Sequence, residues 1–162
     1  MFIVFISIVI ISRIGELFLA RRNEKWLLQK GAVEYGKGHY PFIIALHILF
    51  FFSLLLEYSQ QQSHSYSLLL LILCLLLLAC KAWIITSLGK FWTTKIYRVP
   101  NLPLINKGLY KYFRHPNYLV VMAEIAFIPL AFHLYYTAII FTLLNAAVLL
   151  VRITEENKVL QS

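Results

Sequence analysis

Five long apolar segments, separated by short polar ones, limit the folds open to this chain more than any other feature. They occupy residues 1–20, 41–57, 68–86, 118–132 and 137–151. Lipid offers no hydrogen-bond partners to the backbone, so a segment of about 20 apolar residues crosses the hydrocarbon as a helix. The sequence therefore predicts an all-α polytopic membrane helix bundle of about five transmembrane helices, built as a single domain over residues 1–162.

The composition agrees with a membrane protein and argues against one alternative. Hydrophobic residues make up 60% of the chain and charged residues only 14%, whereas about a quarter of a soluble domain is charged. The net charge is +8, and the chain contains no aspartate. In a soluble protein, such an excess could indicate nucleic-acid binding. We instead interpret it as basic loops that face anionic membrane lipid, and we expect no nucleic-acid partner.

The distribution of the basic residues predicts an orientation. Residues 21–40 and 87–117 hold five and six Lys or Arg, whereas residues 58–67 and 133–136 hold none. By the positive-inside rule, the N-terminus lies outside and the C-terminus lies in the cytoplasm. The long connection at 87–117 is rich in aromatic and apolar side chains, so we expect it to form short interfacial helices and turns.

Polar residues inside the predicted spans are candidates for function. Arg13 and Glu16 are three residues apart in the first span, so they are neighbours on a helix. They form either a local ion pair that reaches toward the interface or the support of a polar pocket. Glu124 in the fourth span is an intramembrane acid, which is a functional candidate by default. We interpret His47 as a hydrogen-bonded interior histidine.

The stretch Arg114-His115-Pro116-Asn117-Tyr118 closes the longest basic connection and opens the fourth span. Proline suits the first turn of a helix, where its missing N–H is not needed, and the free amides there can bind a carboxylate or phosphate. His115 can change its charge near neutral pH, and Asn117 and Tyr118 offer further hydrogen-bonding groups. Taken alone, the pattern fits an interfacial anchor as well as a ligand site.

A second polar stretch, residues 152–156 with the sequence RITEE, follows the fifth span. On a continuous helix Asn145, Arg152 and Glu156 are seven and four residues apart, so they share one face. Glu155 points about 100° away from Glu156. If the last two spans form a helical hairpin, both polar stretches lie at the same membrane face. The sequence therefore predicts that they line a pocket facing the cytosol.

Three stretches together resemble the isoprenylcysteine carboxyl methyltransferase family and its small bacterial relatives. They are Gly108-Leu109-Tyr110, Arg114-His115-Pro116-Asn117-Tyr118 and Arg152-Ile153-Thr154-Glu155-Glu156-Asn157-Lys158-Val159-Leu160. The resemblance covers residues 92–160, and the combined pattern at this spacing is specific. It implies a location in a bacterial cell membrane.

The resemblance also implies S-adenosylmethionine as the cofactor. In that family, the histidine and tyrosine of a His-Pro-x-Tyr motif line the cofactor pocket, which matches His115 and Tyr118. The C-terminal arginine and glutamate lie where cofactor and acceptor meet, so Arg152 and Glu156 are the predicted catalytic residues. The remaining assignments are cofactor binding for Tyr110, Asn117 and Glu155, and support of the pocket for Arg114, Glu124 and Asn145.

The expected reaction is O-methylation of a lipophilic small-molecule acceptor that enters sideways from the membrane. Methyl transfer is an in-line displacement, so positioning of the acceptor oxygen can supply most of the catalysis. Arg152 could hold an acceptor carboxylate or enolate by a bidentate contact, and Glu156 could orient Arg152 or act as the base. A chain this short has little room to dock a protein tail, so we favour a lipid-like or polyketide-type acceptor over a prenylated protein.

Two other functions stay open. A related membrane family N-methylates phospholipid headgroups, and a small membrane protein can also act as a non-enzymatic scaffold or carrier. The sequence identifies no protein partner. It predicts no metal site either, because Cys74 and Cys80 are six residues apart and point in different directions on a helix.

Overall fold

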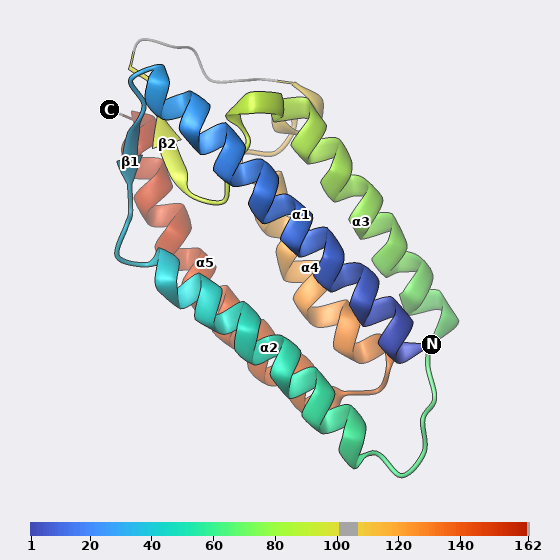
Figure 1. Ribbon diagram of the computed structural model, residues 1–162. Coiled ribbons are helices and arrows are strands. Elements are labelled where there is room, and N and C mark those ends of the chain that lie inside the picture. The colour runs from blue at the N-terminus through green and yellow to red at the C-terminus, as the bar shows by residue number, and fades with distance from the viewer. Residues whose placement is uncertain (101–106, 162) are drawn as a thin grey trace.

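The structure is a computed structural model, and it describes residues 1–100 and 107–161. Within those residues the α-helices are α1 (Phe2–Gln29), α2 (Tyr40–Gln60), α3 (Leu68–Leu88), α4 (Pro116–Ala131) and α5 (Tyr135–Gln161). The connections contain two 3-10 helices, η1 (Gly89–Phe91) and η2 (Gly108–Lys111), and two strands, β1 (Val33–Tyr35) and β2 (Ile96–Arg98). Figure 1 shows an elongated helix bundle with the N-terminus and the end of α5 at opposite ends.

The helices match the predicted membrane architecture. Helices α1, α2, α3 and α5 are long and apolar enough to cross a membrane, by length and composition. Helix α4 is shorter, with 16 residues, and it contains Pro129 near its end. The all-α polytopic bundle is therefore confirmed. Helix α5 continues to Gln161, as predicted for the C-terminal tail.

Helix α1 is longer than the sequence pattern predicts. The expected end lies near residue 20, but the helix continues to Gln29. The reason is a tertiary contact, because the buried Asn23 donates hydrogen bonds from Nδ2 to the backbone oxygens of Gly89 (3.1 Å) and Trp92 (2.7 Å). The helix then stops before Gly31, whose φ of 81° suits glycine.

Strands β1 and β2 form a small antiparallel sheet that the sequence analysis does not predict. Val33 pairs with Arg98, and Tyr35 pairs with Ile96. Strands of three residues are too short to show a pattern of alternation. The 3-10 helices η1 and η2 agree with the short helices expected at residues 87–117, of which residues 101–106 lie outside the described residues.

The end of the bundle that holds the N-terminus is closed by aromatic packing and by a helix cap. Phe2 stacks on Tyr58 with ring centroids 3.8 Å apart, and it meets Phe132 edge-on at 5.0 Å. The Glu57 carboxylate on α2 accepts a hydrogen bond from the backbone N–H of Thr137, in the first turn of α5, at 2.7 Å. These contacts hold the α4–α5 hairpin against α2 and so determine which residues meet at its open end.

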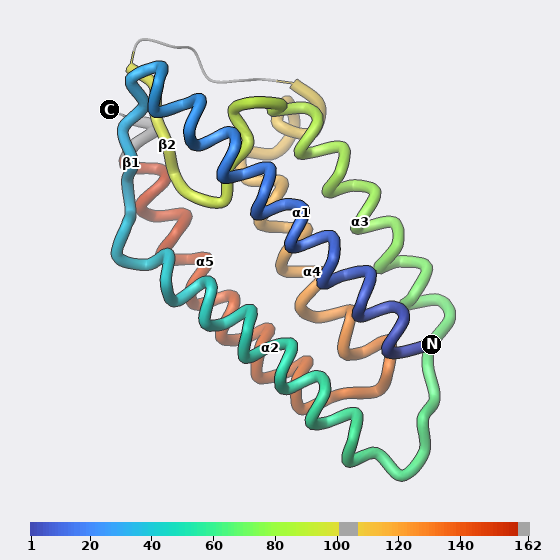
Figure 2. Tube along the Cα trace, in the orientation of Figure 1, coloured from blue at the N-terminus to red at the C-terminus, as the bar shows by residue number. Residues whose placement is uncertain are grey.

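The opposite end of the bundle gathers the two basic connections. Figure 2 shows the chain leaving α1, the β1–β2 pair and the last turns of α5 at this end. The α3–α4 connection and the first turn of α4 lie there as well (Figure 2). The connections that carry the basic residues therefore share one end with both polar stretches singled out in the sequence.

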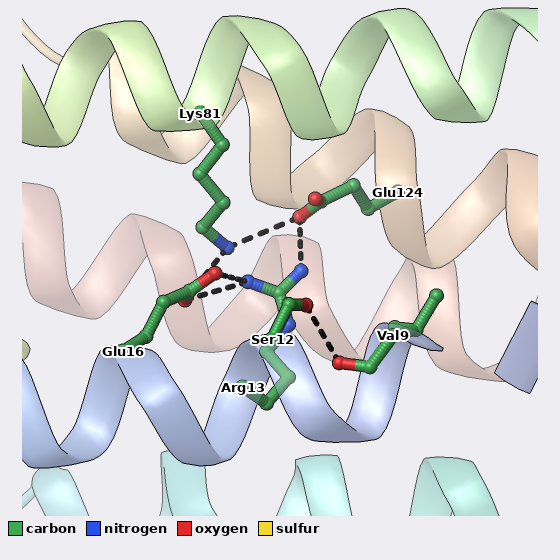
Figure 3. A network of polar contacts seen from close by, with 6 residues as sticks. All are labelled: Val9, Ser12, Arg13, Glu16, Lys81 and Glu124. Atoms are coloured by element: carbon green, nitrogen blue, oxygen red, sulfur yellow. Dashed lines mark hydrogen bonds and ion pairs between the residues drawn. The ribbon is translucent and has the colours of Figure 1, made fainter. Parts of the chain in front are cut away.

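Four charged side chains meet inside the bundle and join α1, α3 and α4 (Figure 3). We call Arg13, Glu16, Lys81 and Glu124 the buried charge cluster. Arg13 bonds both Glu16 oxygens through Nη1, at 2.9 and 2.8 Å, and bonds Glu124 Oε2 through Nη2 at 2.5 Å. Lys81 Nζ lies 3.3 Å from Glu16 and 3.2 Å from Glu124. The Arg13–Glu16 pair is thus part of a tertiary cluster and does not reach toward the interface.

Stability gives a test of the buried charge cluster. We expect Lys81→Met to lower the free energy of unfolding by about 3 kcal/mol, because it leaves two buried carboxylates with one cation. Thermal unfolding of purified protein in detergent measures the change. Cys80→Ala on the same helix, at a partly exposed position, should change the stability by less than about 0.5 kcal/mol.

The double variant Lys81→Met with Glu16→Gln retains one cation and one carboxylate. It should therefore recover most of the stability that the single Lys81→Met variant loses. A double variant as unstable as the single one would contradict charge balance as the cause.

Candidate functional site

The candidate site lies where the first turn of α4 meets the last turns of α5. Helix α4 begins at Pro116, directly after His115. The α4–α5 hairpin is antiparallel, so the start of α4 lies beside the later part of α5 (Figure 1). This geometry brings Tyr118 and Arg152 together, although they are 34 positions apart in the chain.

The hydroxyl group of Tyr118 is the centre of the site. Arg152 donates from Nε to this oxygen at 2.7 Å, and the hydroxyl in turn donates to Glu156 Oε2. The Arg152 guanidinium also lies over the Tyr118 ring, 5.1 Å from its centroid. The two predicted catalytic residues are therefore linked through Tyr118 and not by a direct ion pair.

His115 completes the group on the α4 side. Its ring stacks on Tyr118 with centroids 5.2 Å apart. Nδ1 lies 3.5 Å from Glu156 Oε2, and Nε2 lies 3.2 Å from Oδ1 of Asn157. An amide oxygen only accepts, so Nε2 carries the hydrogen of that bond. We call His115, Tyr118, Arg152, Glu156 and Asn157 the Tyr118 cluster.

A backbone oxygen from the α3–α4 connection fixes the second edge of Arg152. Arg152 donates from Nη2 to the Thr94 carbonyl at 2.7 Å. The Thr94 hydroxyl is hydrogen-bonded to the Tyr40 hydroxyl at 2.9 Å. The next residue, Lys95, lies over the Tyr40 ring and forms an ion pair with Glu34 of β1 at 3.4 Å. The sequence analysis assigns neither Thr94 nor Tyr40 to the site, and the Thr94 carbonyl contact leaves no side-chain signature.

Two polar atoms at this end of the bundle have no partner among the described residues. Nη1 of Arg152 makes no hydrogen bond to them, and it is a donor. Oδ1 of Asn117, which is an acceptor, is buried and has no hydrogen-bond partner among the described residues. A buried polar atom without a partner is costly, so it marks a place where a ligand group can bind.

Tyr110 on η2 approaches the Tyr118 cluster from the side. Burial raises the pKa of the Tyr110 phenol, and the negative charge of Glu156 raises it further, while Arg152 acts in the opposite direction. The phenol therefore stays protonated at neutral pH and is a hydrogen-bond donor. The position of Tyr110 depends on Gly108, two residues earlier. The φ of Gly108 is 57°, and a Cβ there would lie 2.3 Å from the Ser87 hydroxyl oxygen, so the position requires glycine.

His39 directly precedes α2, and its imidazole is influenced by the charge of Arg152. Burial lowers the pKa of the His39 imidazole, and the positive charge of Arg152 lowers it too. The ring packs on Gly36, where a Cβ would lie 2.2 Å from His39 Cε1. The α1–α2 connection therefore contributes a neutral imidazole close to Arg152, which the sequence analysis does not assign to the site.

The remaining predicted site residues do not contact the Tyr118 cluster. Arg114 is exposed, and Glu155 is 39% exposed and pairs with Lys158 at 2.7 Å. Asn145 and Glu124 are buried, but by the rise of a helix Asn145 lies about 10.5 Å from Arg152 along α5, and Glu124 lies about 9 Å from Tyr118 along α4. Glu124 belongs to the buried charge cluster. The functional assignments of all these residues remain predictions.

The fold and the site define a membrane helix bundle with a polar site at one end of its C-terminal hairpin. The pattern of the isoprenylcysteine carboxyl methyltransferase (ICMT) family matches residues 69–162, and the chain belongs to this family. The match begins earlier than the resemblance at residues 92–160, and it includes Lys81. Family membership and the four long apolar helices together make the chain an integral membrane protein of a methyltransferase family.

Two relatives resemble most of the chain. Uncharacterized protein YpbQ of Bacillus subtilis (strain 168) is 44% identical over 164 residues, covering 99% of this chain and 97% of that protein. An uncharacterized protein of Haemophilus influenzae (strain ATCC 51907 / DSM 11121 / KW20 / Rd) is 32% identical over 147 residues, covering 89% and 86%. No solved structure matches the chain.

The Tyr118 hydroxyl can be tested without an activity assay. We expect Tyr118→Phe to lower the free energy of unfolding by about 2 kcal/mol, because it leaves the buried Arg152 and the partly exposed Glu156 carboxylate without their shared partner. Thermal unfolding in detergent measures the change. Tyr112→Phe, at a tyrosine that is 74% exposed, is the matched control and should have no effect. Equal stability of the two variants would show that the Tyr118 hydroxyl does not hold the site together.

Proposed function

We propose that this chain is an S-adenosylmethionine-dependent methyltransferase that O-methylates a lipophilic acceptor. The methylated group is a carboxylate or an acidic hydroxyl of a lipid-like or polyketide-type molecule. Membership of the ICMT family supports the reaction class. The geometry of the Tyr118 cluster supports oxygen as the acceptor atom.

The single observation that carries this proposal is the fixed guanidinium of Arg152. Arg152 is only 8% exposed, and it is held by the Tyr118 hydroxyl and the Thr94 carbonyl. Nη1 remains available as a donor to a ligand. A guanidinium fixed in advance suits a carboxylate or enolate oxygen, because it need not reorganise when the acceptor binds.

The residues present fit the cofactor by their chemistry. S-adenosylmethionine carries an ammonium group, ribose hydroxyls and an adenine amine, which need acceptors, and a carboxylate, which needs donors. The unpartnered Oδ1 of Asn117 is such an acceptor, and the protonated Tyr110 phenol is a donor. The residues that would hold the cofactor are His115, Tyr118, Asn117, Tyr110 and Glu155. When bound, the cofactor supplies an electrophilic methyl group.

The protein's own residues hold the acceptor and manage its proton. Arg152 binds the acceptor oxygen and stabilises its negative charge, which keeps the oxygen deprotonated. If the acceptor is a hydroxyl, Glu156 accepts its proton, because its carboxylate lies within reach of the same Tyr118 oxygen that holds Arg152. Glu156 takes the proton from the acceptor oxygen and later releases it to water, while the bound cofactor would supply the methyl group and leave as the neutral thioether S-adenosylhomocysteine.

The position of the site at the end of the bundle supports separate routes for the two reactants. We place the basic connections and the C-terminus in the cytoplasm and the N-terminus outside, in a bacterial cell membrane, by the positive-inside rule. A water-soluble cofactor then reaches the Tyr118 cluster from the cytosol. A lipophilic acceptor reaches it from the bilayer. The cofactor therefore need not enter the bilayer, and the acceptor need not enter water.

Cofactor binding is the first test. Purified protein in detergent should bind S-adenosylhomocysteine in isothermal titration calorimetry. Asn117→Ala should weaken this binding about tenfold, because it removes one hydrogen bond to a buried acceptor. Absence of binding at millimolar ligand would overturn the proposal.

The acceptor side has its own test. Arg152→Ala should lower the transfer of radiolabelled methyl to extracted host lipids by about 100-fold or more, while Arg22→Ala, a charge removed at an exposed position of α1, should leave it unchanged. Arg152→Lys should restore little activity, because an ammonium cannot make the bidentate contact. Near-normal methylation by Arg152→Ala at equal protein level would contradict the role of Arg152. Label that appears on ethanolamine headgroups would instead identify a phospholipid N-methyltransferase.

A further inference from the structure

A small cavity lies inside the bundle, away from the Tyr118 cluster. It is formed by residues of α1, α2 and α4 and has a volume of about 10 Å³, which is room for one water-sized group. Glu124 in its wall is six residues after Tyr118, which is about 9 Å along α4. The lining residues are Val9, Arg13, His47, Phe50, Phe51, Val121, Glu124, Ile125 and Ile128.

Glu124 presents an unused acceptor in this wall. Its carboxylate is 2% exposed, and Oε2 accepts hydrogen bonds from both Arg13 and Lys81. The other oxygen, Oε1, is buried and has no partner among the described residues. The charge of the carboxylate is therefore balanced, while one of its oxygens still needs a hydrogen-bond donor.

His47 presents a second acceptor. Its Nδ1 lies 2.8 Å from the Ile43 carbonyl oxygen of the same helix. A carbonyl oxygen only accepts, so Nδ1 carries the hydrogen and Nε2 of the neutral ring has a free lone pair. Among the described residues, no hydrogen bond to Nε2 is formed. The cavity wall thus holds two acceptors that lack a donor.

Apart from Arg13, whose charge is paired with Glu16 and Glu124, the remainder of the wall is apolar. Val9, Phe50, Ile125 and Ile128 are buried, whereas His47, Phe51 and Val121 are partly exposed. Of the partly exposed residues, His47 and Phe51 lie in α2, which is long and apolar enough to cross a membrane, and Val121 lies in the shorter apolar helix α4. A molecule in the bilayer can therefore place a small polar group in the cavity and leave its chain among apolar side chains.

We propose that this cavity is a second binding site, which takes the hydroxyl group of a lipid-like alcohol or phenol from the membrane. The O–H group donates to Oε1 of Glu124 or to Nε2 of His47, and the alkyl chain lies outside the cavity against the partly exposed Phe51 and Val121. A carboxylate or phosphate is too large for the volume and would face the Glu124 carboxylate. The site is independent of the methyl-transfer site, and it does not depend on the reaction proposed there.

A pair of matched probes tests the site. One is a 12-carbon alcohol with a photoreactive diazirine in its chain, and the other is its methyl ether, which has the same chain but no donor. The purified full-length protein in lipid nanodiscs is irradiated with each probe, and the labelled residues are mapped by mass spectrometry. The alcohol should label the walls of the cavity in a saturable way and about tenfold more than the ether, which corresponds to one hydrogen bond to a charged or buried acceptor.

Three variants compare the acceptor atom, the space of the cavity and a position outside it. His47→Phe keeps a ring of similar size but removes Nε2, and Val121→Phe fills the cavity, so each should lower labelling about tenfold. Cys80→Ala changes a partly exposed residue of α3 that does not line the cavity, and it should leave labelling within about twofold of the unchanged protein.

Each other outcome overturns the proposal. Equal labelling by the alcohol and the ether would show that the cavity does not recognise the hydroxyl group and binds only the alkyl chain. Absence of saturable labelling would show that the cavity does not bind the alcohol and has room for water alone. Equal labelling of His47→Phe and Cys80→Ala means that Nε2 of His47 does not bind the hydroxyl group. Because the comparison of the two probes uses the unchanged protein, it decides the question even if a variant fails to fold.

Discussion

The docking of α4 depends on balancing charge inside the hydrocarbon. Apolar helix faces have little preference for one another in a bilayer, because lipid chains are as apolar as leucine. An unpaired charge at that depth is costly, so α1, α3 and α4 can pack only where Arg13 and Lys81 meet Glu16 and Glu124. The buried charge cluster therefore sets the register of α4, and α4 carries the first half of the candidate site.

The second half of the site depends on contacts between segments far apart in sequence. The hairpin brings α5 beside α4, and the Glu57 cap on α5 holds this hairpin from the opposite end. The guanidinium of Arg152 then receives one partner from α4, the Tyr118 hydroxyl, and one from the α3–α4 connection, the Thr94 carbonyl. Its orientation is consequently a property of the whole fold and not of the RITEE stretch.

The sequence predicts those features that a regular pattern encodes. Apolar segments of membrane length predict the helices, and helical spacing predicts that Arg152 and Glu156 share a face. Contacts made by backbone atoms or by single residues leave no such pattern. The role of Thr94 rests on its carbonyl oxygen, and the strands β1 and β2 have three residues each. The extension of α1 to Gln29 likewise follows from the Asn23 contact with Gly89 and Trp92, which only the folded chain contains. Lys81 is different, because it is a charged residue inside the predicted span 68–86, a signal that the sequence analysis does not use.

The two polar regions along α4 suit opposite kinds of ligand. In the Tyr118 cluster, the available atom of Arg152 is a donor with a positive charge, so this region favours an oxyanion. In the cavity beside the buried charge cluster, the charges of Arg13 and Lys81 are already balanced by two carboxylates, and the available atoms are acceptors. This inner region therefore favours a neutral O–H group and repels an anion. An anionic ligand is thus favoured by the Tyr118 cluster and disfavoured in the inner cavity.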